Sequence, residues 1–264
     1  MPTYNCADKV EKTLRSVLSQ NEELYELIIV DGASTDDTVE RLGNFESNFT
    51  LVSESDNGIY NAFNKGIDLA TGRYIYFIGA GDCLRPGILA QLKDLLPLER
   101  PTLVYGKCYF VKNRYFDGRE LKTTDFSWTN ICHQGEFYHR SIFTLVGKYD
   151  ERYKVFSDWL LNLKCFLSGE IETVYIPVHI ADFEEDGISS NLDNDPVFKK
   201  EFPVFVRRNL GLKAFFICKF KMMKPNSVYF SHGVGYPLVY ETLQPLISLI
   251  RPYYRKYLKG KLGK

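Results

Sequence analysis

Acidic and hydroxyl residues crowd together directly after an apolar run in residues 28–38, "IIVDGASTDDT". The apolar run has the composition of a buried strand and ends at Asp31, and Ser34 and Asp36 follow closely. Carboxylate and hydroxyl oxygens at a strand end can accept hydrogen bonds from a ligand. The alternative is that Ser34 and Asp37 form a capping box that starts a helix, which leaves Asp31 without a role.

A second polar segment, residues 53–67, has the sequence "SESDNGIYNAFNKGI". Its glycines allow a ligand to approach the backbone closely, and Lys65 is a candidate to contact a phosphate or a base. Asp56 and Asn57 are candidates for the same site. They are equally suited to a turn and an N-cap before a helix, so the residues alone leave both interpretations open.

Apolar periodicity predicts alternating strands and helices as far as residue 176. The predicted strands are residues 26–30, 50–53, 74–78, 103–111 and 171–176, and the predicted helices begin near Val10, Ser34, Ile59, Pro86 and Asp158. This alternation predicts an α/β fold with a mostly parallel sheet flanked by helices. Ligands bind beyond the carboxyl ends of strands in such sheets, where both polar segments lie. Tyr60 and Phe63 are assigned to the core.

A parallel sheet of this kind needs a first strand before the helix at Val10. The chain starts with "MPTYN", which offers no room for one. The sequence therefore predicts that the first strand is missing and that the natural protein begins upstream.

The length of 264 residues allows one large α/β domain with an appendage. We expect the domain to span residues 1–185 and residues 186–264 to form a basic, aromatic-rich helical extension. The net charge is zero, but residues 207–264 hold twelve Lys or Arg and one acid, so the preceding part is acidic. Such a tail favours an anionic membrane surface. The alternative is a solvated face that packs back on the acidic domain.

Six cysteines are scattered along the chain without CxxC spacing. The sequence also shows neither a signal peptide nor an apolar span of about 18 residues. These features predict reduced thiols in a cytoplasmic protein rather than a disulfide framework or a zinc site.

Four segments occur in an order and at intervals that resemble the family 2 glycosyltransferases. They are Pro2-Thr3-Tyr4-Asn5, then "VDGASTDDT" at 30–38, "SESDNGIYNAFNKGI" at 53–67 and "IYFIGAGDCL" at 75–84. The resemblance covers residues 1 to about 185 and implies an inverting enzyme with the GT-A fold. The form of the third segment resembles the branch that builds bacterial cell-surface polysaccharides.

The resemblance implies that the acidic cluster binds a nucleotide-sugar. Asp31 would accept from a base N–H, and Asp36 or Ser34 would meet the ribose. The implied nucleotide-sugar contacts are Pro2, Thr3, Tyr4, Asn5, Asp31, Ser34, Asp36, Asp56, Asn57 and Lys65.

The family's metal motif usually holds two carboxylates, and only Asp82 remains at this place because Gly81 replaces the other. The resemblance implies that Asp82 binds a divalent metal, Mn²⁺ or Mg²⁺, which prefers hard oxygen ligands and neutralises the leaving diphosphate. The missing acid predicts weaker metal binding. A simple turn before Pro86 is the alternative.

The resemblance also places an acceptor side and a catalytic base. His133 and Gln134 in "HQGEFYHRSIF" are the implied sugar or acceptor contacts, and Asp158 in "YDERYKVFSDWLLNLKCF" is the implied base. An inverting transfer needs a carboxylate within hydrogen-bond reach of the attacking hydroxyl. The alternative for Asp158 is an N-cap beside Ser157.

Together these features predict transfer of a sugar from a UDP- or GDP-sugar to a hydroxyl of a growing, lipid-linked cell-surface glycan. The expected location is the inner face of the plasma membrane, with the basic tail in peripheral contact. The alternative is a degenerate module that binds a nucleotide-sugar or a partner without turnover. A nucleic-acid binder is not expected, because the acidic domain interrupts any cationic track. Dehydrogenase and P-loop glycine fingerprints are absent from the sequence.

Overall fold

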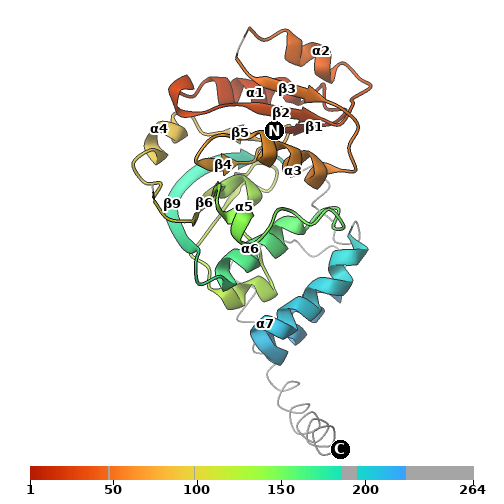
Figure 1. Cartoon of the computed structure of the whole chain (residues 1–264), viewed down its shortest axis with the longest axis vertical. Helices are drawn as coiled ribbons and strands as arrows, with labels where there is room; N and C mark the ends of the chain where they lie inside the picture. The colour runs from red at the N-terminus through yellow and green to blue at the C-terminus, as the bar shows by residue number, and fades with distance from the viewer. Residues whose placement is uncertain (47, 98, 186–194, 224–264) are drawn as a thin grey trace, which may run out of the picture.

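The computed structural model describes residues 1–46, 48–97, 99–185 and 195–223. Two β-sheets and the helices packed against them make up the described chain. Figure 1 shows α1 (Val10–Leu18) and α2 (Thr38–Gly43) at one end of the molecule and α7 (Pro196–Met223) at the other. The predicted α/β class is confirmed.

Three parallel strands form the first sheet, in the order β1 (Pro2–Thr3), β2 (Ile28–Asp31) and β3 (Thr50–Ser53). The prediction of a missing first strand is wrong. Pro2 and Thr3 pair with Val30 and Asp31, and the Met1 amino group donates to the Ile28 carbonyl at 2.8 Å. Two residues are enough to pair with β2, but they are too few to produce a periodic pattern in the sequence.

The second sheet is mixed rather than mostly parallel. It contains β4 (Tyr74–Tyr76), β5 (Cys83–Leu84), β6 (Thr102–Phe110), β7 (Tyr115–Asp117), β8 (Glu136–His139) and β9 (Glu172–Phe183). Its order is β4-β8-β6-β9-β5, with β7 paired to β6, and only β6 and β9 run parallel. The difference arises because β7 returns in a hairpin and β8 lies antiparallel between β4 and β6, and neither connection is a helical crossover.

The remaining helices are α3 (Ile59–Leu69), α4 (Ile88–Leu92), α5 (Ile142–Leu145) and α6 (Ser157–Leu167), with short 3₁₀ turns η1 (Glu22–Leu24), η2 (Thr123–Ser127) and η3 (His133–Gly135). Helical apolar spacing places one face of each long helix in the core. One core cluster lies under α1, α2 and α4, and a second joins α3, α5, α6 and α7. These two clusters, with the elements around them, are the two halves of the molecule.

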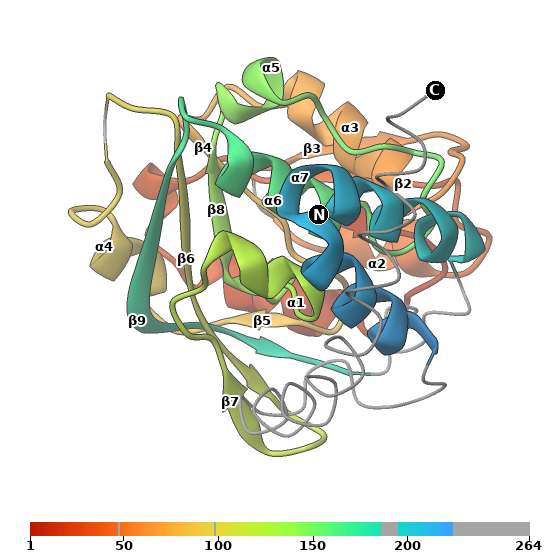
Figure 2. The same cartoon turned by 90° about the horizontal axis from the view of Figure 1, so that it is seen from below.

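α7 lies beside α6 (Figure 2), and aromatic side chains of the two helices are in contact. Phe198 and Phe202 are fully buried with ring centroids 4.4 Å apart, and the Trp159 ring of α6 lies 5.4 Å from Phe202. The predicted helical extension therefore begins as part of the core, although the division at residue 185 stays a prediction. Residues 224–264 lie outside the described residues. None of the described helices is long and apolar enough to cross a membrane.

Asp31 ties together the ends of all three strands of the first sheet. Its fully buried carboxylate accepts from the Thr3 hydroxyl (3.0 Å), the Ser34 N–H (2.9 Å) and hydroxyl (2.5 Å), and the Ser53 hydroxyl (2.7 Å). Burial opposes ionisation, but these hydrogen bonds outweigh it and lower the pKa of Asp31.

The predicted capping box of Ser34 and Asp37 is wrong. α2 begins at Thr38, and Asp37 stands at its N-cap without a side-chain bond to the helix. Asp36 instead accepts from the Thr38 N–H (3.1 Å) and hydroxyl (2.5 Å). Ser34 donates to Asp31 instead of capping α2, because a buried carboxylate is stable only when its oxygens accept hydrogen bonds.

Replacing Asp31 with Ala is expected to lower the free energy of unfolding by about 2–4 kcal/mol, because four donors lose their acceptor. Since the folded pKa lies below the unfolded value, the loss is full at neutral pH and shrinks as the pH falls through the folded pKa. Urea denaturation at several pH values measures it. Asp37→Ala is the control, with an expected change within about 0.5 kcal/mol. Equal losses in both variants would contradict the structural role of Asp31.

Replacing Phe202 with Ala is expected to cost about 3–5 kcal/mol of stability, since it leaves a cavity between α7 and α6. Val204, on the same helix and 43% exposed, provides the matched control Val204→Ala. Thermal or urea unfolding followed by circular dichroism compares the two. If Phe202→Ala were as stable as the control, α7 would not belong to the same cooperative core.

Candidate active site

A cleft of about 840 Å³ opens where the two halves of the molecule meet. Its walls come from the loop after β1, the start of α3, the loop between β4 and β5, η3 and the start of α6. The predicted site residues that line it are Pro2, Thr3, Tyr4, Asn5, Asp56, Asp82, His133, Gln134 and Asp158. The fold thus brings together nine residues that the sequence spreads over more than half the chain.

The other predicted residues, Asp31, Ser34, Asp36, Asn57 and Lys65, are not among the lining residues. Ser34 accepts from the Asn5 N–H (2.9 Å), and Asp36 accepts from the Ala7 N–H (3.1 Å). With Asp31 behind them, these side chains support the loop that carries Tyr4 and Asn5. Their contacts in this structure are within the protein.

Tyr4 and Asp56 line the end of the cleft beside Gly32. The Tyr4 side chain is 65% exposed, and a Cβ on Gly32 would lie 2.8 Å from Asp56 Oδ2 and 3.3 Å from the Tyr4 ring. A side chain at position 32 would push the Asp56 carboxylate and the Tyr4 ring aside. Asp56 also accepts from the Gly58 N–H (2.9 Å), so it forms the predicted turn and lines the cleft as well. Lys65 does not line the cleft, but its amine pairs with Glu54 (2.9 Å) and donates to the carbonyl of Ser55, which does (3.2 Å).

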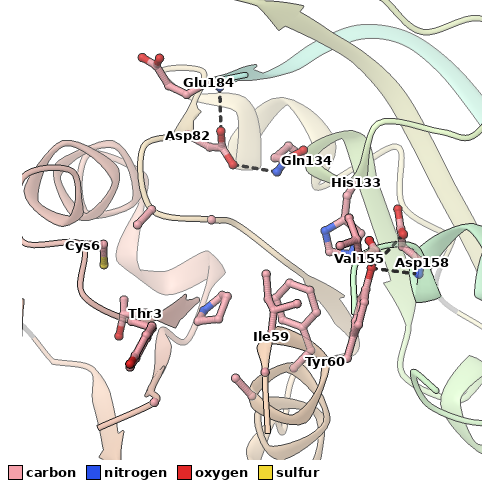
Figure 3. Close-up of a pocket in the computed structure, with 18 of the residues that line it drawn as sticks. Thr3, Cys6, Ile59, Tyr60, Asp82, His133, Gln134, Val155, Asp158 and Glu184 are labelled. Atoms are coloured by element: carbon pink, nitrogen blue, oxygen red, sulfur yellow. Dashed lines mark hydrogen bonds between the residues drawn. The ribbon is translucent and has the colours of Figure 1, made fainter. Parts of the chain in front are cut away.

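Asp82 lies on one wall of the cleft and is 4% exposed. Its carboxylate accepts from Gln134 Nε2 (2.7 Å) and from the Glu184 N–H (2.9 Å), as Figure 3 shows. Burial raises the pKa of Asp82 to about 7 despite these two bonds. Among the described residues no Lys or Arg forms an ion pair with it. A bound cation would supply the positive charge that this buried carboxylate lacks.

Glu184 meets Asp82 through its backbone N–H, and its carboxylate points away from Asp82 (Figure 3). Gly81 has a φ of 106°, a conformation that favours glycine, and a Cβ there would lie 3.6 Å from the Glu184 side chain. The Glu184 carboxylate pairs with Lys12 at 2.5 Å. The described residues hold no group of three or more His, Cys, Asp or Glu able to bind a metal. A metal bound at Asp82 would need further oxygen ligands from a molecule bound in the cleft or from water.

Asp158 lies in the first turn of α6 and also lines the cleft. Asn130 Nδ2 donates to its Oδ2 (2.8 Å), and Tyr60 Oη lies 3.0 Å from its Oδ1. Burial raises the pKa of Asp158 to about 6. Phe156 holds the N-cap position and no side chain caps the helix, so the N-cap interpretation of Asp158 is wrong.

His133 stands in the cleft between these two carboxylates (Figure 3). Its ring stacks on Phe77 with centroids 5.4 Å apart, and Nε2 lies 2.9 Å from Tyr149 Oη. Burial lowers the pKa of His133 to about 3, so the ring is neutral. It offers a ligand an aromatic surface rather than a positive charge.

Sequence reasoning missed three residues of the site: Tyr60, Asn130 and Glu184. The Tyr60 ring is buried as predicted, but its hydroxyl reaches Asp158 and the Val155 carbonyl. Glu184 donates to a carboxylate 102 positions away. Of these three residues, only Tyr60 lies in one of the segments that resemble the family, so nothing in the sequence indicated Asn130 or Glu184.

The chain matches a family model and several curated proteins. Residues 1–157 match the family described as Glycosyl transferase family 2. A PGL/p-HBAD biosynthesis glycosyltransferase of Mycobacterium bovis is 34% identical over 230 residues, covering 80% of this chain and 86% of that protein. The putative teichuronic acid biosynthesis glycosyltransferase TuaG of Bacillus subtilis is 38% identical over 128 residues, covering 47% and 46%. These names fit the predicted cell-surface branch.

Solved structures share the fold. S. aureus TarS 1-349 in complex with UDP-GlcNAc aligns with a TM-score of 0.63 at 15% identity, covering 84% of this chain and 70% of that one. The mannosyltransferase PcManGT from Pyrobaculum calidifontis, in complex with GDP-Man and Mn²⁺, aligns with a TM-score of 0.51 at 18% identity, covering 85% and 64%. The GT-A fold is confirmed, and with the family match over more than half its length the chain belongs to glycosyl transferase family 2.

Proposed function

We propose that the protein transfers a sugar from a UDP- or GDP-sugar to an acceptor hydroxyl with inversion at the anomeric carbon. The observation that carries this proposal is the placing of two carboxylates, Asp82 and Asp158, in one cleft with His133 between them. One can face the leaving diphosphate while the other faces the attacking hydroxyl. The complexes of TarS with UDP-GlcNAc and of PcManGT with GDP-Man support this class of donor.

The nucleoside end of the donor binds beside Tyr4, Asn5 and Asp56 in this proposal. The exposed Tyr4 ring can pack against a base, and the Asp56 carboxylate can accept from a base N–H or a ribose hydroxyl. Asp31, Ser34 and Asp36 contribute by holding the loop that carries Tyr4 and Asn5.

The diphosphate lies toward Asp82, where a divalent metal, Mn²⁺ or Mg²⁺, would bind. A buried carboxyl group without a described ion pair fits such a cation, which would favour its ionised form, and Gln134 orients it. When bound, the metal acts as a Lewis acid that stabilises charge on the departing diphosphate. Its other ligands would be donor oxygens and water.

Asp158 is the base in the proposed reaction. The acceptor oxygen attacks the anomeric carbon, its proton passes to Asp158, and the bond from that carbon to the diphosphate oxygen breaks on the far side. Attack opposite the leaving group inverts the configuration. Asn130 donates to one carboxylate oxygen, and the Tyr60 hydroxyl, whose single hydrogen is shared between the Val155 carbonyl and Asp158, lies 3.0 Å from the other. These contacts fix the orientation of the carboxylate and leave lone pairs for the incoming proton.

The acceptor is a growing glycan, carried on a lipid at the inner face of the plasma membrane. The neutral His133 ring lies between the two carboxylates and can pack against the face of a sugar. The basic residues of the tail would hold the enzyme at an anionic leaflet.

A panel of nucleotide-sugars, each scored for release of nucleoside diphosphate with Mn²⁺ or with EDTA, tests the proposal. Metal-dependent release is expected from one UDP- or GDP-sugar. Asp158→Asn is expected to reduce turnover by about two to four orders of magnitude, since asparagine keeps the shape but cannot take a proton. Nucleotide binding, measured by calorimetry, should be unchanged in this variant.

Two results would overturn the proposal. Full turnover in folded Asp158→Asn would remove the base assignment. No release together with no binding of UDP or GDP would instead favour a degenerate interaction module.

The acidic limb of the kcat/KM profile is expected near pH 6, because burial raises the pKa of Asp158 to about 6 and only the ionised form accepts a proton. Below that pH the rate falls about tenfold per unit. Tyr60→Phe removes a hydroxyl whose hydrogen is shared between the Val155 carbonyl and this carboxylate, so we expect its limb up to about one unit higher. A limb that stays in place in Tyr60→Phe would show that another group titrates.

A further inference from the structure

A buried chain of hydrogen bonds joins the proposed base to a second carboxyl group that the proposed reaction does not use. Asp158 Oδ2 accepts from Asn130 Nδ2 (2.8 Å), and Asn130 Oδ1 accepts from Asn162 Nδ2 (3.0 Å). The same Asn162 nitrogen donates to Glu136 Oε1. Tyr138 Oη lies 2.6 Å from Glu136 Oε2 and 2.7 Å from Asn162 Oδ1. Glu136, Tyr138 and Asn162 are fully buried.

The amide and hydroxyl groups of this network carry a fixed number of hydrogens, and that number determines which atom donates in each contact. An ionised Asp158 needs a donor from Asn130, which turns the Asn130 oxygen toward Asn162. Asn162 must then present its two amide hydrogens to Asn130 and Glu136, so its oxygen faces Tyr138. That oxygen can only accept, so the single hydroxyl hydrogen of Tyr138 goes to Asn162.

The 2.6 Å contact between Tyr138 Oη and Glu136 Oε2 then lacks a hydrogen from the tyrosine. Two oxygens at this distance need a hydrogen between them, and Glu136 is the group left to provide it. We propose that Glu136 is held as a neutral carboxylic acid, with its proton on Oε2, and that it thereby fixes the amide orientation that keeps Asp158 ionised. Glu136 is a positioning residue, because it acts on the base through Asn162 and Asn130.

The surroundings of the two carboxyl groups agree with this assignment. The other titratable side chains that face them are Tyr60 from α3, Tyr138 from β8, Tyr149 ahead of α6 and Cys165 from α6. Burial raises the pKa of each of these four, so all are neutral at neutral pH. Burial also raises the pKa of Glu136 well above its usual range. One carboxyl group is neutral and the other is ionised because their environments differ.

The inference rests on the proposed role of Asp158 as the base, but its test does not require turnover. The full chain, labelled with ¹³C at the side-chain carboxyl groups of Glu and Asp, is studied by infrared spectroscopy and NMR. At pH 8 we expect a carboxylic acid C=O band that is lost in Glu136→Gln. A spectrum of the wild-type protein without any such band overturns the proposal even if no variant folds.

The titration of Asp158 by NMR gives the second measurement. In Glu136→Gln the amide nitrogen can donate to Tyr138 and the oxygen can accept from Asn162, so the Asp158 midpoint is expected to stay within about 0.3 pH unit of wild type. Removing the donor in Asn130→Leu is expected to raise the midpoint by about one to two units. Asn209→Ala, which removes an exposed amide on α7, is the matched control and should leave it unchanged.

A fall of the Asp158 midpoint by about one unit in Glu136→Gln would overturn the proposal, because it would mean that a negative charge had been removed. Failure of the proposed function is distinct. It would appear as absent transfer in the nucleotide-sugar panel, while the infrared band would still report the state of Glu136.

Discussion

Carboxyl groups taken out of water and held by neutral donors are the constraint on which this structure depends. Asp31, Asp82, Glu136 and Asp158 all lie in positions where burial opposes ionisation, and hydroxyl, amide and backbone N–H groups surround them in place of lysine or arginine. Each such group costs several kcal/mol unless its hydrogen bonds are made. The elements that carry the donors are therefore fixed relative to one another. Asp31 and Glu136 lie at the ends of strands, and Asp82 lies directly before β5.

The number of donors decides the state of each group. Asp31 has four donors and a lowered pKa, so it is a structural anion that closes the ends of the first sheet. Asp82 and Asp158 have fewer and remain poised to respond to a cation or a proton. A buried, hydrogen-bonded carboxyl group is thus a structural residue at Asp31 and a candidate reactive group at Asp82 and Asp158. A family 2 glycosyltransferase needs both, because its donor is an anion and its acceptor must lose a proton.

The mixed second sheet is what brings the two reactive walls together. β8 lies between β4 and β6, so the η3 turn before it carries His133 and Gln134 into the cleft. β9 runs on to Phe183 and places Glu184 beside Asp82. A purely parallel arrangement would have left these two segments on other edges. The helices were easier to foresee, since α3 and α6 begin within one residue of the expected positions.

The sequence by itself determined the family, the alternating elements of the first half and most of the residues that line the cleft, because those residues occur in ordered motifs at strand ends. The tertiary structure decided what each one does. Asp31 is a structural residue because its donors come from three separate strands and loops, and Ser34 serves it instead of capping α2. Tyr60, Asn130 and Glu184 joined the site only through contacts between distant segments. Hydrogen bonding and burial depend on positions in space, and a single sequence does not encode those positions in any local pattern.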